Sequence, residues 1–575
     1  MTTTQPTIGR PSPMGRGLRR VWGRVRGQGA FGASVVASVL IIVGFVLFPA
    51  AEIVARSLGA DGRAEWERLF GASRTIGTIR NTIWLGVLVG IVGTIAGLIM
   101  ALVQVRTRFR FKRTLHLIAL IPVISPPFAV GMSVITLFGR SGLITKGLFD
   151  VRYDIFGLDG LLISLGVSFM PIAYLNFVGM LRAFDGSLEE AATDLGAGLI
   201  HRLRTVVLPL LAPGIASSFL LIFVSAIADL GNPVLLGGGY DVLSSRIYLA
   251  VIGEFNNDKA AVLAVMLLVP SLLVFSAQYF WLRKREYITV TGKPVGDPKP
   301  FEQRRVTWPL QLLAVLMAAF VVLIYGYILV GAFTEVWNIN FSPTLDNMRF
   351  VLRGAGREAV YDTVLLALLA TPISSLAGLV IAFVITQRDF RGKGLLDFAS
   401  VLGVAIPGTI IGVGLLLAYN APLLGGLIPK LSGTAAILVL AFTVRSLPGV
   451  VRVAVGALNQ LSGSLEEASI SLGATPAQTF RKVILPLIRP AMFSSLVWSF
   501  ARSMTSLSPI IFLGTPQWRI MTARILNEAD QGRFSNAAAY SVVLVSVVLA
   551  AISLLALTTG FRVNDEPTLP DRSMR

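Results

Sequence analysis

Long apolar stretches constrain the fold of this chain more than any other feature. Each is about 20 residues long, enough for a helix to cross the hydrocarbon core of a bilayer. They lie near 31–55, 81–104, 114–138, 158–181, 206–230 and 260–282, and then near 308–333, 362–386, 395–419, 433–456, 486–513 and 537–561. Pro122, Pro126 and Pro127 interrupt the third stretch, and Pro407 with Gly408 the ninth, so the ends of these two are uncertain. The sequence predicts an all-α integral membrane protein with about twelve transmembrane helices.

The composition agrees with a membrane protein. Apolar residues make up 54% of the chain and charged residues 14%, whereas a soluble chain carries about 25% charged residues. The absence of Cys excludes disulfides, thiolate metal sites and a cysteine nucleophile. The net charge of +19 is better explained by membrane orientation than by nucleic acid, which we do not expect as a partner.

A polar segment occurs twice inside this apolar chain. Residues 187–196 read Ser-Leu-Glu-Glu-Ala-Ala-Thr-Asp-Leu-Gly, and residues 464–473 read Ser-Leu-Glu-Glu-Ala-Ser-Ile-Ser-Leu-Gly. Each is followed by a Leu-Pro-Leu segment, within 187–213 and 464–490. From 187 to 237 the copies align without a gap, with about 20 of 51 positions identical.

The repeat extends upstream of these loops and covers both halves of the chain. Asn81-Thr-Ile matches Asp362-Thr-Val, and Pro126 falls opposite Pro407. Six spans in each copy give the halves the same orientation, so we expect two parallel six-helix repeats. The predicted organisation is a basic tail (1–30), a first half (31–283), a linker (284–306), a second half (307–562) and a short tail (563–575).

The distribution of Lys and Arg predicts the orientation, since cytoplasmic segments are enriched in both. Basic residues gather in the N-terminal tail, the 105–113 loop and the linker. With twelve spans, all three lie on one side together with both polar loops and the C-terminal tail. We therefore expect a multi-pass protein of a bacterial plasma (inner) membrane, with both termini cytoplasmic. The segment 56–80 fits less well, because it holds five Arg on the other side.

The polar loops carry local signals for short helices. Ser187 with Glu190, and Ser464 with Glu467, have the spacing of a capping box, so a helix should begin at each Ser. Gly196 and Gly473 follow where a left-handed residue would end that helix. In the second copy, Thr475-Pro476-Ala-Gln478 opens another helix, whereas the first copy has Gly198 there and its second helix is less certain. We expect a helix-turn-helix along the membrane surface.

These loops resemble the EAA loop of ABC importer permeases, on which the ATPase subunit docks. Two loops in one chain imply a fused permease with the type I ABC importer fold. The resemblance implies two copies of an ABC ATPase, an extracytoplasmic substrate-binding protein and surrounding lipid as partners. It assigns ATPase docking to Glu189, Glu190, Ala191, Gly196, Glu466, Glu467, Ala468 and Gly473, with the glutamates facing basic groups of the ATPase.

The chain itself contains no Gly-x-x-x-x-Gly-Lys-Ser/Thr phosphate-binding loop. ATP hydrolysis is therefore expected on a separate subunit. The chain is interpreted as a transport subunit rather than an enzyme, with no cofactor.

Other stretches resemble the ferric iron importer family, among them 138–144, 228–233 and 236–243. The resemblance implies ferric iron as the substrate, held by the binding protein, and no metal site is apparent in the chain. The alternatives within the same importer class are a phosphonate, a sugar phosphate, thiamine or a polyamine. A secondary transporter with parallel repeats is the alternative from another class, although it would not need paired docking loops.

A few polar residues within the spans are candidates for the substrate path: Asp229, Asn232, Arg445 and Arg502. A charge at such depth is costly and usually faces a partner or an aqueous cavity. An asymmetric basic lining would accept an anionic or anion-complexed substrate, because Ser168 and Ser225 occupy the positions of the two Arg in the first half. The alternative is a structural ion pair between Asp229 and an Arg. His116, in the third span, is interpreted as a hydrogen-bonded packing residue.

Overall fold

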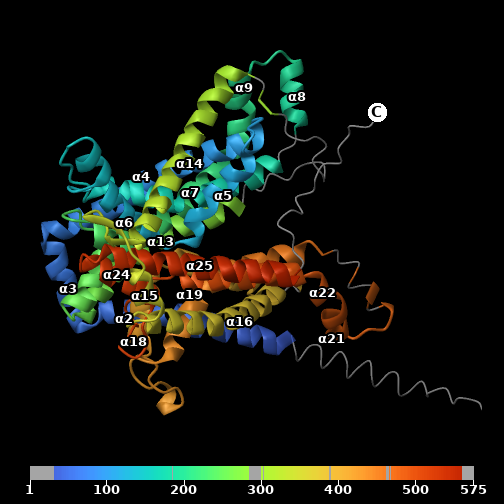
Figure 1. Cartoon of the computed structure of the whole chain (residues 1–575). Helices are drawn as coiled ribbons and strands as arrows, with labels where there is room; N and C mark the ends of the chain where they lie inside the picture. The colour runs from blue at the N-terminus through green and yellow to red at the C-terminus, as the bar shows by residue number, and fades with distance from the viewer. Residues whose placement is uncertain are drawn as a thin grey trace, which may run out of the picture.

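The computed structural model describes residues 31–183, 186–283, 300–301, 303–387, 390–461, 465, 468–469 and 471–559. The predicted tails 1–30 and 563–575 and most of the linker lie outside these residues. The described chain is mainly helical (Figure 1). The elements of the first half are η1 (Val43–Leu47), α2 (Phe48–Leu58), α3 (Ala60–Gly71), α4 (Ser73–Arg106), α5 (Lys112–Ile124), α6 (Pro127–Phe138), η2 (Leu143–Leu148), α7 (Leu158–Arg182), α8 (Ser187–Asp194), α9 (Leu199–Arg202), η3 (Leu203–Val207), α10 (Leu208–Ala228), α11 (Gly231–Leu236), α12 (Leu243–Tyr248), η4 (Leu249–Gly253) and α13 (Asn257–Arg283).

The second half repeats the order of the long helices and also contains a two-stranded antiparallel sheet of β1 and β2. The elements are α14 (Arg304–Ala332), β1 (Thr334–Val336), β2 (Asn340–Pro343), α15 (Asp346–Leu352), α16 (Arg357–Gln387), α17 (Lys393–Ala405), α18 (Gly408–Ala418), η5 (Leu424–Gly426), α19 (Ala435–Asn459), α21 (Pro476–Thr479), η6 (Phe480–Ile484), α22 (Leu485–Leu487), α23 (Arg489–Met504), α24 (Met521–Asp530) and α25 (Phe534–Thr559).

The predicted number of spans is confirmed. Ten helices in the described residues are long and apolar enough to cross a membrane, and two bent helix pairs bring the total to as many as 12. The ninth predicted span bends by 105° between α17 and α18, at the Pro407–Gly408 break that the sequence indicated. The third divides into α5 and α6 at Ser125–Pro126.

One predicted boundary is wrong. The eleventh stretch, predicted over 486–513, ends as a helix at Met504 and bends by 61° between its two helical parts. The apolar sequence continues past Met504 because residues such as Ile510 are buried in turns that pack against α18, rather than in a continued helix. Hydropathy registers burial but does not distinguish a helix from a buried turn.

The two halves repeat their internal packing as well as their sequence. α4 packs against α7 and α10 in the first half, as α16 packs against α19 and α23 in the second. The Thr82 hydroxyl accepts a hydrogen bond from the Leu243 backbone N–H at 2.9 Å, and the Thr363 hydroxyl accepts one from Met521 at 2.8 Å. The same side-chain bond therefore anchors a short helix, α12 or α24, in each copy.

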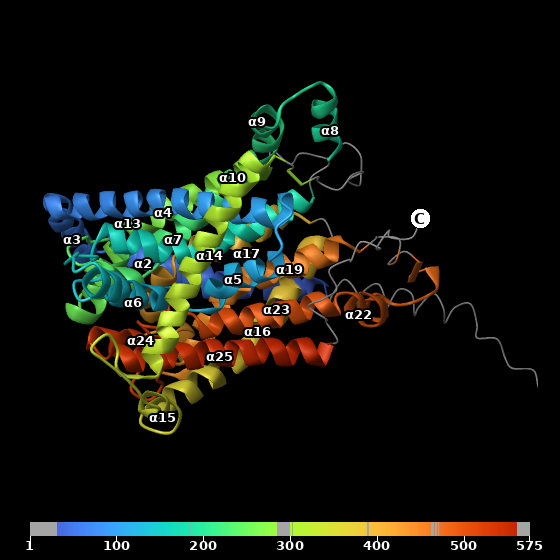
Figure 2. The same cartoon turned by 45° about the horizontal axis from the view of Figure 1, so that its top comes forward.

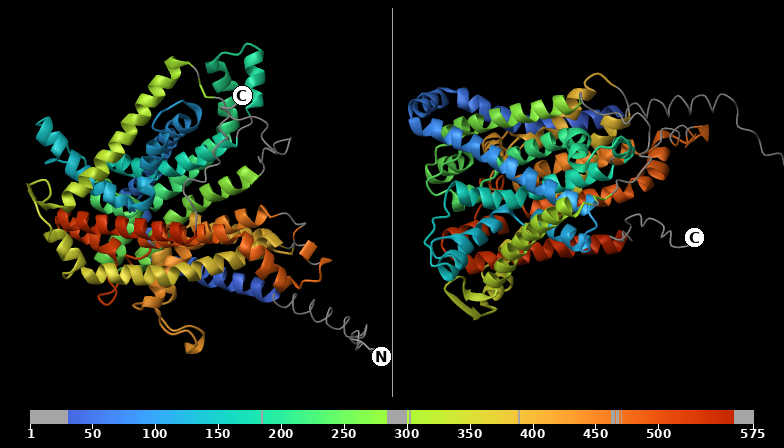
Figure 3. Two further views of the ribbon diagram at one scale, coloured as in Figure 1. Left: turned by 45° about the vertical axis from the view of Figure 1, so that its right-hand side comes forward. Right: turned by 90° about the horizontal axis from the view of Figure 1, so that it is seen from above.

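The first span of each half packs on the other half, which the linear repeat does not reveal. The span 31–58 contacts α18, where the Tyr419 hydroxyl donates to the Gly44 carbonyl at 2.7 Å. In return α14 packs along α4, α5 and α6, and the Ser133 hydroxyl donates to the Ile324 carbonyl at 3.0 Å. The left panel of Figure 3 shows this exchange, with the blue N-terminal span beside the second half and α14 beside the first. The exchange ties the two halves together.

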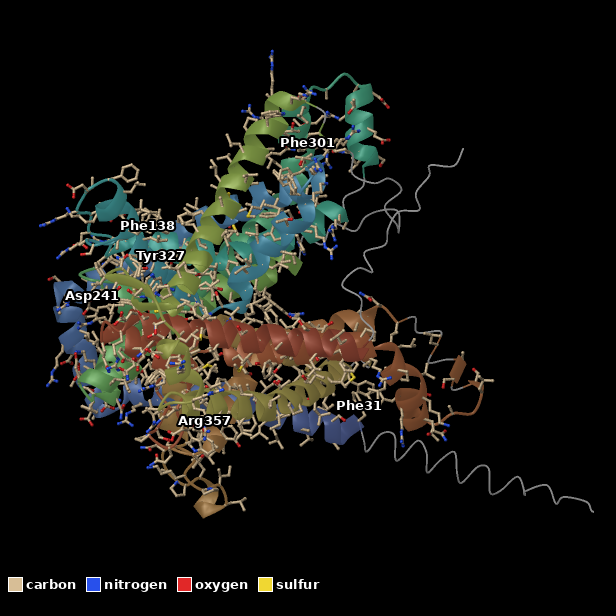
Figure 4. The ribbon with its side chains drawn as sticks, in the orientation of Figure 1. Phe31, Phe138, Asp241, Phe301, Tyr327 and Arg357 are labelled. Atoms are coloured by element: carbon tan, nitrogen blue, oxygen red, sulfur yellow. The ribbon has the colours of Figure 1, made fainter. Side chains whose placement is uncertain are left out.

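The molecule has two distinct ends along the direction of its long helices. The short helices α8 and α9, and likewise α21 and α22, lie at one end and extend beyond the packed helices (Figure 2). Phe31 and Phe301 lie at the same end, whereas Asp241, Phe138 and Arg357 lie at the other (Figure 4). We call these the hairpin end and the opposite end.

Two of the five arginines of segment 56–80 form ion pairs with acidic residues from later in the chain, at the opposite end. Arg56 pairs with Asp258 at 2.7 Å and Arg74 with Asp241 at 2.8 Å. These ion pairs offset the positive charge that made this segment a poor fit to the orientation rule.

Candidate functional site: two helical hairpins and the polar groups within the spans

The first hairpin comprises α8, a turn, and α9 continuing through η3 into α10. α8 begins at Ser187, as predicted, with Gly186 at the N-cap position. Gly196 has φ +81°, the left-handed conformation predicted for the residue that ends this helix. The helix left uncertain by the sequence does form, with Gly198 at its N-cap. Because helical structure is unbroken from Leu199 to Ala228, the hairpin is mechanically continuous with a membrane span.

The second hairpin reproduces this design with different side chains. Gly473 has φ +86°. The predicted cap at Thr475 forms: the backbone N–H of Thr475 donates to the Gln478 side chain at 2.9 Å, and the Gln478 N–H donates to the Thr475 hydroxyl at 3.3 Å. α21, η6 and α22 follow and lead to α23 through the 61° bend. Ser464, Glu466 and Glu467 lie outside the described residues.

The structure corrects the expected orientation of Glu189. Its carboxylate is buried and forms an ion pair with Arg106, the last residue of α4, and Arg202 lies 3.9 Å from its other oxygen. Arg106 is itself fully buried and lies under the Phe301 ring, whose centroid is 4.9 Å from the guanidinium carbon. Glu189 therefore attaches α8 to the rest of the first half and does not face outward. A buried carboxylate is costly unless it is paired or hydrogen-bonded, and here the folded chain supplies a guanidinium.

The outward face of each hairpin carries two exposed leucines at equivalent positions. Leu195 is 88% exposed and its counterpart Leu472 is 89% exposed. Leu188 and Leu465 are 52% and 43% exposed. Large apolar side chains grouped on an otherwise polar projection are typical of an interaction site. All four leucines belong to the repeated motif, although none of them is among the docking residues predicted from it.

The remaining predicted docking residues lie on the same exposed surfaces. Glu190, Ala191 and Gly196 are exposed in the first hairpin, and Ala468 and Gly473 in the second. In the first hairpin a hollow of about 420 Å³ opens between the two helices, lined by Ala192, Leu195, Gly196, Ala197, Gly198, His201 and Thr205. The small residues keep the turn open, so a partner's side chain has room to enter.

Asp229 and Asn232 form a local pair in the first half. The Asp229 carboxylate accepts hydrogen bonds from the backbone N–H of Asn232 at 2.9 Å and from its side-chain amide at 3.0 Å. The side-chain carbonyl oxygen of Asn232 in turn accepts a hydrogen bond from the Ser164 hydroxyl at 2.5 Å. The expected alternative of an ion pair between Asp229 and Arg445 or Arg502 is wrong, because among the described residues neither guanidinium lies within salt-bridge distance of a carboxylate. Asp229 holds the start of α11 instead.

His116 has the role expected from the sequence. Its Nδ1 atom lies 2.7 Å from the Tyr174 hydroxyl, and the two rings pack together. This contact joins α5 to α7.

A larger hollow lies between the two halves at the opposite end. It has a volume of about 620 Å³ and is bounded by α11 and α12 of the first half and α24 of the second. Its polar lining includes Tyr240, Asp241, Tyr248, Asn527 and Asp530. Residues of both halves are therefore accessible together in this hollow, at the end that lacks hairpins.

Comparisons with known proteins agree with this arrangement. The family model described as "Binding-protein-dependent transport system inner membrane component" matches residues 93–286 and 370–562, once in each half. The chain is 34% identical over 539 residues to a protein of Actinobacillus pleuropneumoniae named ferric transport system permease protein FbpB, covering 90% of this chain and 77% of that one. It is 34% identical over 504 residues to a putative ferric transport system permease protein of Haemophilus influenzae, covering 85% and 78%. A putative 2-aminoethylphosphonate transport system permease protein of Salmonella typhimurium is 29% identical over 240 residues, covering 41% of this chain and 88% of that one.

Proposed function

Because the chain belongs to the family of binding-protein-dependent transport system inner membrane components, we propose that it is the fused permease of an ATP-driven importer for ferric iron. The observation that carries the proposal is the pair of equivalent hairpins at one end, each presenting the same exposed leucines. A single chain with two such hairpins offers one docking surface to each of two ATPase subunits.

Docking is proposed to use the outward faces of the hairpins. Leu188 and Leu195 in the first copy, and Leu465 and Leu472 in the second, would be buried by the ATPase. The exposed small residues Ala191, Gly196, Ala468 and Gly473 would allow close approach, while Glu190, Glu466 and Glu467 supply charge. Glu189 is not part of this surface, but it holds α8 in place through its ion pair with Arg106 of α4.

The hairpin end is proposed to be the cytoplasmic one. Phe31 (Figure 4) and the C-terminal end of α25 (Figure 1) both lie there. The basic tail 1–30, the linker 284–306 and the tail 563–575 would then all be cytoplasmic, as the distribution of Lys and Arg predicts. The binding protein would deliver its substrate to the opposite end, above the 620 Å³ hollow.

Coupling would follow from the continuity between hairpin and span. The two hairpins stand well apart (Figure 1), so closure of two ATP-bound ATPases would draw them together. In the first half this motion passes along an uninterrupted helix from Leu199 to Ala228. In the second half it passes through the bend before α23. The halves would rock about the central path and open it outward.

Ferric iron is proposed from the names of relatives that align over most of this chain. A phosphonate is the second candidate, because a relative named for 2-aminoethylphosphonate aligns with 41% of the chain. The binding protein would select the substrate, so the permease need not hold a metal of its own.

The test is uptake of radioactive ferric iron in cells that lack this chain, complemented with wild type or with Leu195→Asp/Leu472→Asp. These side chains are almost fully exposed, so the double variant should fold normally. It should fail to bind the ATPase, and the rate of ferric iron uptake should fall at least tenfold. Ile339→Asp, which alters a side chain that is 83% exposed at the opposite end, is the matched control.

Normal import by the double variant would refute the docking assignment. Equal iron uptake with and without the wild-type chain would refute ferric iron as the substrate.

A further inference from the structure

The guanidinium groups of two arginines within the spans of the second half have no ion-pair or hydrogen-bond partner among the residues that the structure describes. Arg445 is the eleventh of the 25 residues of α19, and Arg502 lies in the last turn of α23. α23 ends inside the protein, because its last residue, Met504, and Ile510 beyond the helix are both fully buried. Among the described residues, neither guanidinium has a carboxylate, a hydroxyl or an aromatic ring as a partner. Two uncompensated cations are thus placed well inside the span region.

Helix geometry places both arginines on the same side of the α19–α23 pair. The two helices run antiparallel, and the hydroxyls of Ser446 and Ser503 meet between them at 3.4 Å. Each Arg directly precedes one of these serines, so it is rotated by about 100° from the contact line. For two antiparallel helices these rotations turn the preceding residues toward the same side. The two arginines therefore lie at the level of this serine contact and on the same side of the helix pair.

A network of serine hydroxyls holds this geometry. Ser499 bonds Ser374 of α16 at 2.5 Å, and the Ser446 hydroxyl lies 3.4 Å from the Ser499 carbonyl. Because α16, α19 and α23 are tied together at this level, the helix backbones that carry the two arginines cannot separate without breaking these contacts. The basic pair is therefore built into the fold.

The partial exposure of these side chains indicates the kind of space that they reach. Both arginines are partly exposed at their depth. A charged side chain at membrane depth does not face hydrocarbon, and typically faces a water-filled cavity or a bound ion. We therefore expect the exposed part of the pair to face water or a bound ion rather than hydrocarbon.

The first half lacks this positive charge. Ser168 and Ser225 stand at the equivalent positions, and both donate their hydroxyl hydrogens to carbonyls of their own half: Ser168 to Ser164 at 2.7 Å, and Ser225 to Leu221 at 2.8 Å. At these equivalent positions the positive charge is therefore confined to the second half, and an anionic substrate that reached them would be held against that half.

We propose that Arg445 and Arg502 form an oxyanion site on the translocation path, which takes the phosphate-like group of the transported species. Paired guanidiniums present several N–H donors to the oxygens of such a group. A bare ferric ion would be repelled there, so iron would pass with its oxyanion ligand, or the substrate would carry a phosphate group of its own. The inference rests on the proposed importer function and specifies the chemistry of its cargo.

The direct test is binding of radioactive orthophosphate to the full-length chain in phosphatidylcholine nanodiscs. We expect saturable binding that weakens at least tenfold in Arg445→Gln/Arg502→Gln and is largely retained in the corresponding double Lys variant. Arg452→Gln is the matched control, because Arg452 lies on α19 but is about half exposed and is paired with Asp397 at 3.7 Å. Unchanged elution and thermal melting would establish that each variant folds.

Equal binding by wild type and the double Gln variant, or no saturable binding by wild type, would overturn the inference. Uptake by the complete importer then distinguishes an oxyanion that accompanies iron from a phosphate group that belongs to the substrate itself. One arm measures uptake of ferric iron supplied with orthophosphate, and the other measures uptake of glycerol 3-phosphate without iron. We expect the double Gln variant to lose whichever uptake the wild type shows. Equal iron uptake by wild type and by the double Gln variant would also overturn the oxyanion site, while the proposed importer function would stand. If wild type transports neither compound, the ferric iron proposal fails, and the binding measurement decides the role of the arginines independently.

Discussion

The two hairpins have similar turn conformations but are attached to the rest of the molecule by different kinds of side-chain contact. In the first, the buried pair of Arg106 and Glu189 attaches α8 to α4. In the second, Gln387 and Thr479 stand where the repeat has Arg106 and Arg202. There the Ser469 and Thr479 hydroxyls meet at 2.9 Å. A duplicated element can therefore keep its outward face while its attachment diverges, and the two hairpins should differ in sensitivity to charge removal but not in docking.

Removal of Arg106 should have the largest effect. Arg106→Met removes the guanidinium that pairs with buried Glu189 and leaves only Arg202, 3.9 Å from the other carboxylate oxygen. Breaking a buried pair in this way typically costs about 3–5 kcal/mol. We expect residues 187–207 to lose protection in hydrogen exchange and the ATPase to dissociate. Gln387→Met, at the equivalent position of the second half, is the matched control and should change little.

A compensating variant separates the charge from the packing. Arg106→Met/Glu189→Leu removes both charges and should recover most of the lost protection, because buried pairs can often be replaced by apolar residues. If Arg106→Met alone leaves hydrogen exchange at 187–207 unchanged, the ion pair does not anchor the first hairpin.

Single leucine variants test whether the hairpins dock equally. Leu195→Asp and Leu472→Asp should each weaken ATPase binding by about 2 kcal/mol, the loss expected for an interface hot spot, without changing the thermal melting of the permease. Co-purification of the ATPase at increasing salt measures the loss. A strong effect at one leucine only would show that the equal exposure of 88% and 89% conceals unequal contacts.

The sequence predicted much of the hairpins because their signals are local. The left-handed Gly196 and Gly473 and the cap at Thr475 each depend on residues within a few positions. The environment of Glu189 was missed because its partner Arg106 lies 83 residues upstream. The exchange of first spans was missed for the same reason: hydropathy identifies the span 31–58 but not the half against which it packs.

The candidate path residues show the same limit. Charge and depth singled out Arg445 and Arg502, and the structure leaves them unpaired among the described residues. The same reasoning suggested an ion pair for Asp229, which instead bonds Asn232, three residues away. Sequence predicted that these charges need compensation but not which groups supply it.

The glycines at the hairpin turns should respond alike in both copies. Gly196→Ala and Gly473→Ala each place a Cβ at a positive φ, which costs about 1–2 kcal/mol. No neighbouring atom lies within 4 Å of either added Cβ, so backbone strain is the only cost. Hydrogen exchange of the two turns should change by the same amount, and a clearly larger change in one would show that its turn is held by contacts as well as by conformation.

The smallest expected effect tests the hydroxyl anchor of the second hairpin. Ser469→Ala removes the bond to Thr479, which is worth about 1 kcal/mol, and Thr479 is buried, so its hydroxyl would be left without this partner. We expect a modest loss of hydrogen-exchange protection over 476–484. Ala192 and Arg202 occupy the equivalent positions in the first copy, so Ala192→Ser is the reciprocal variant. It should change hydrogen exchange little, because the added hydroxyl would face Arg202 and not a second hydroxyl. If Ser469→Ala perturbed the second hairpin as strongly as Arg106→Met perturbs the first, hydroxyl and ionic anchors would be equivalent in strength, and the contrast between the hairpins would be one of chemistry alone.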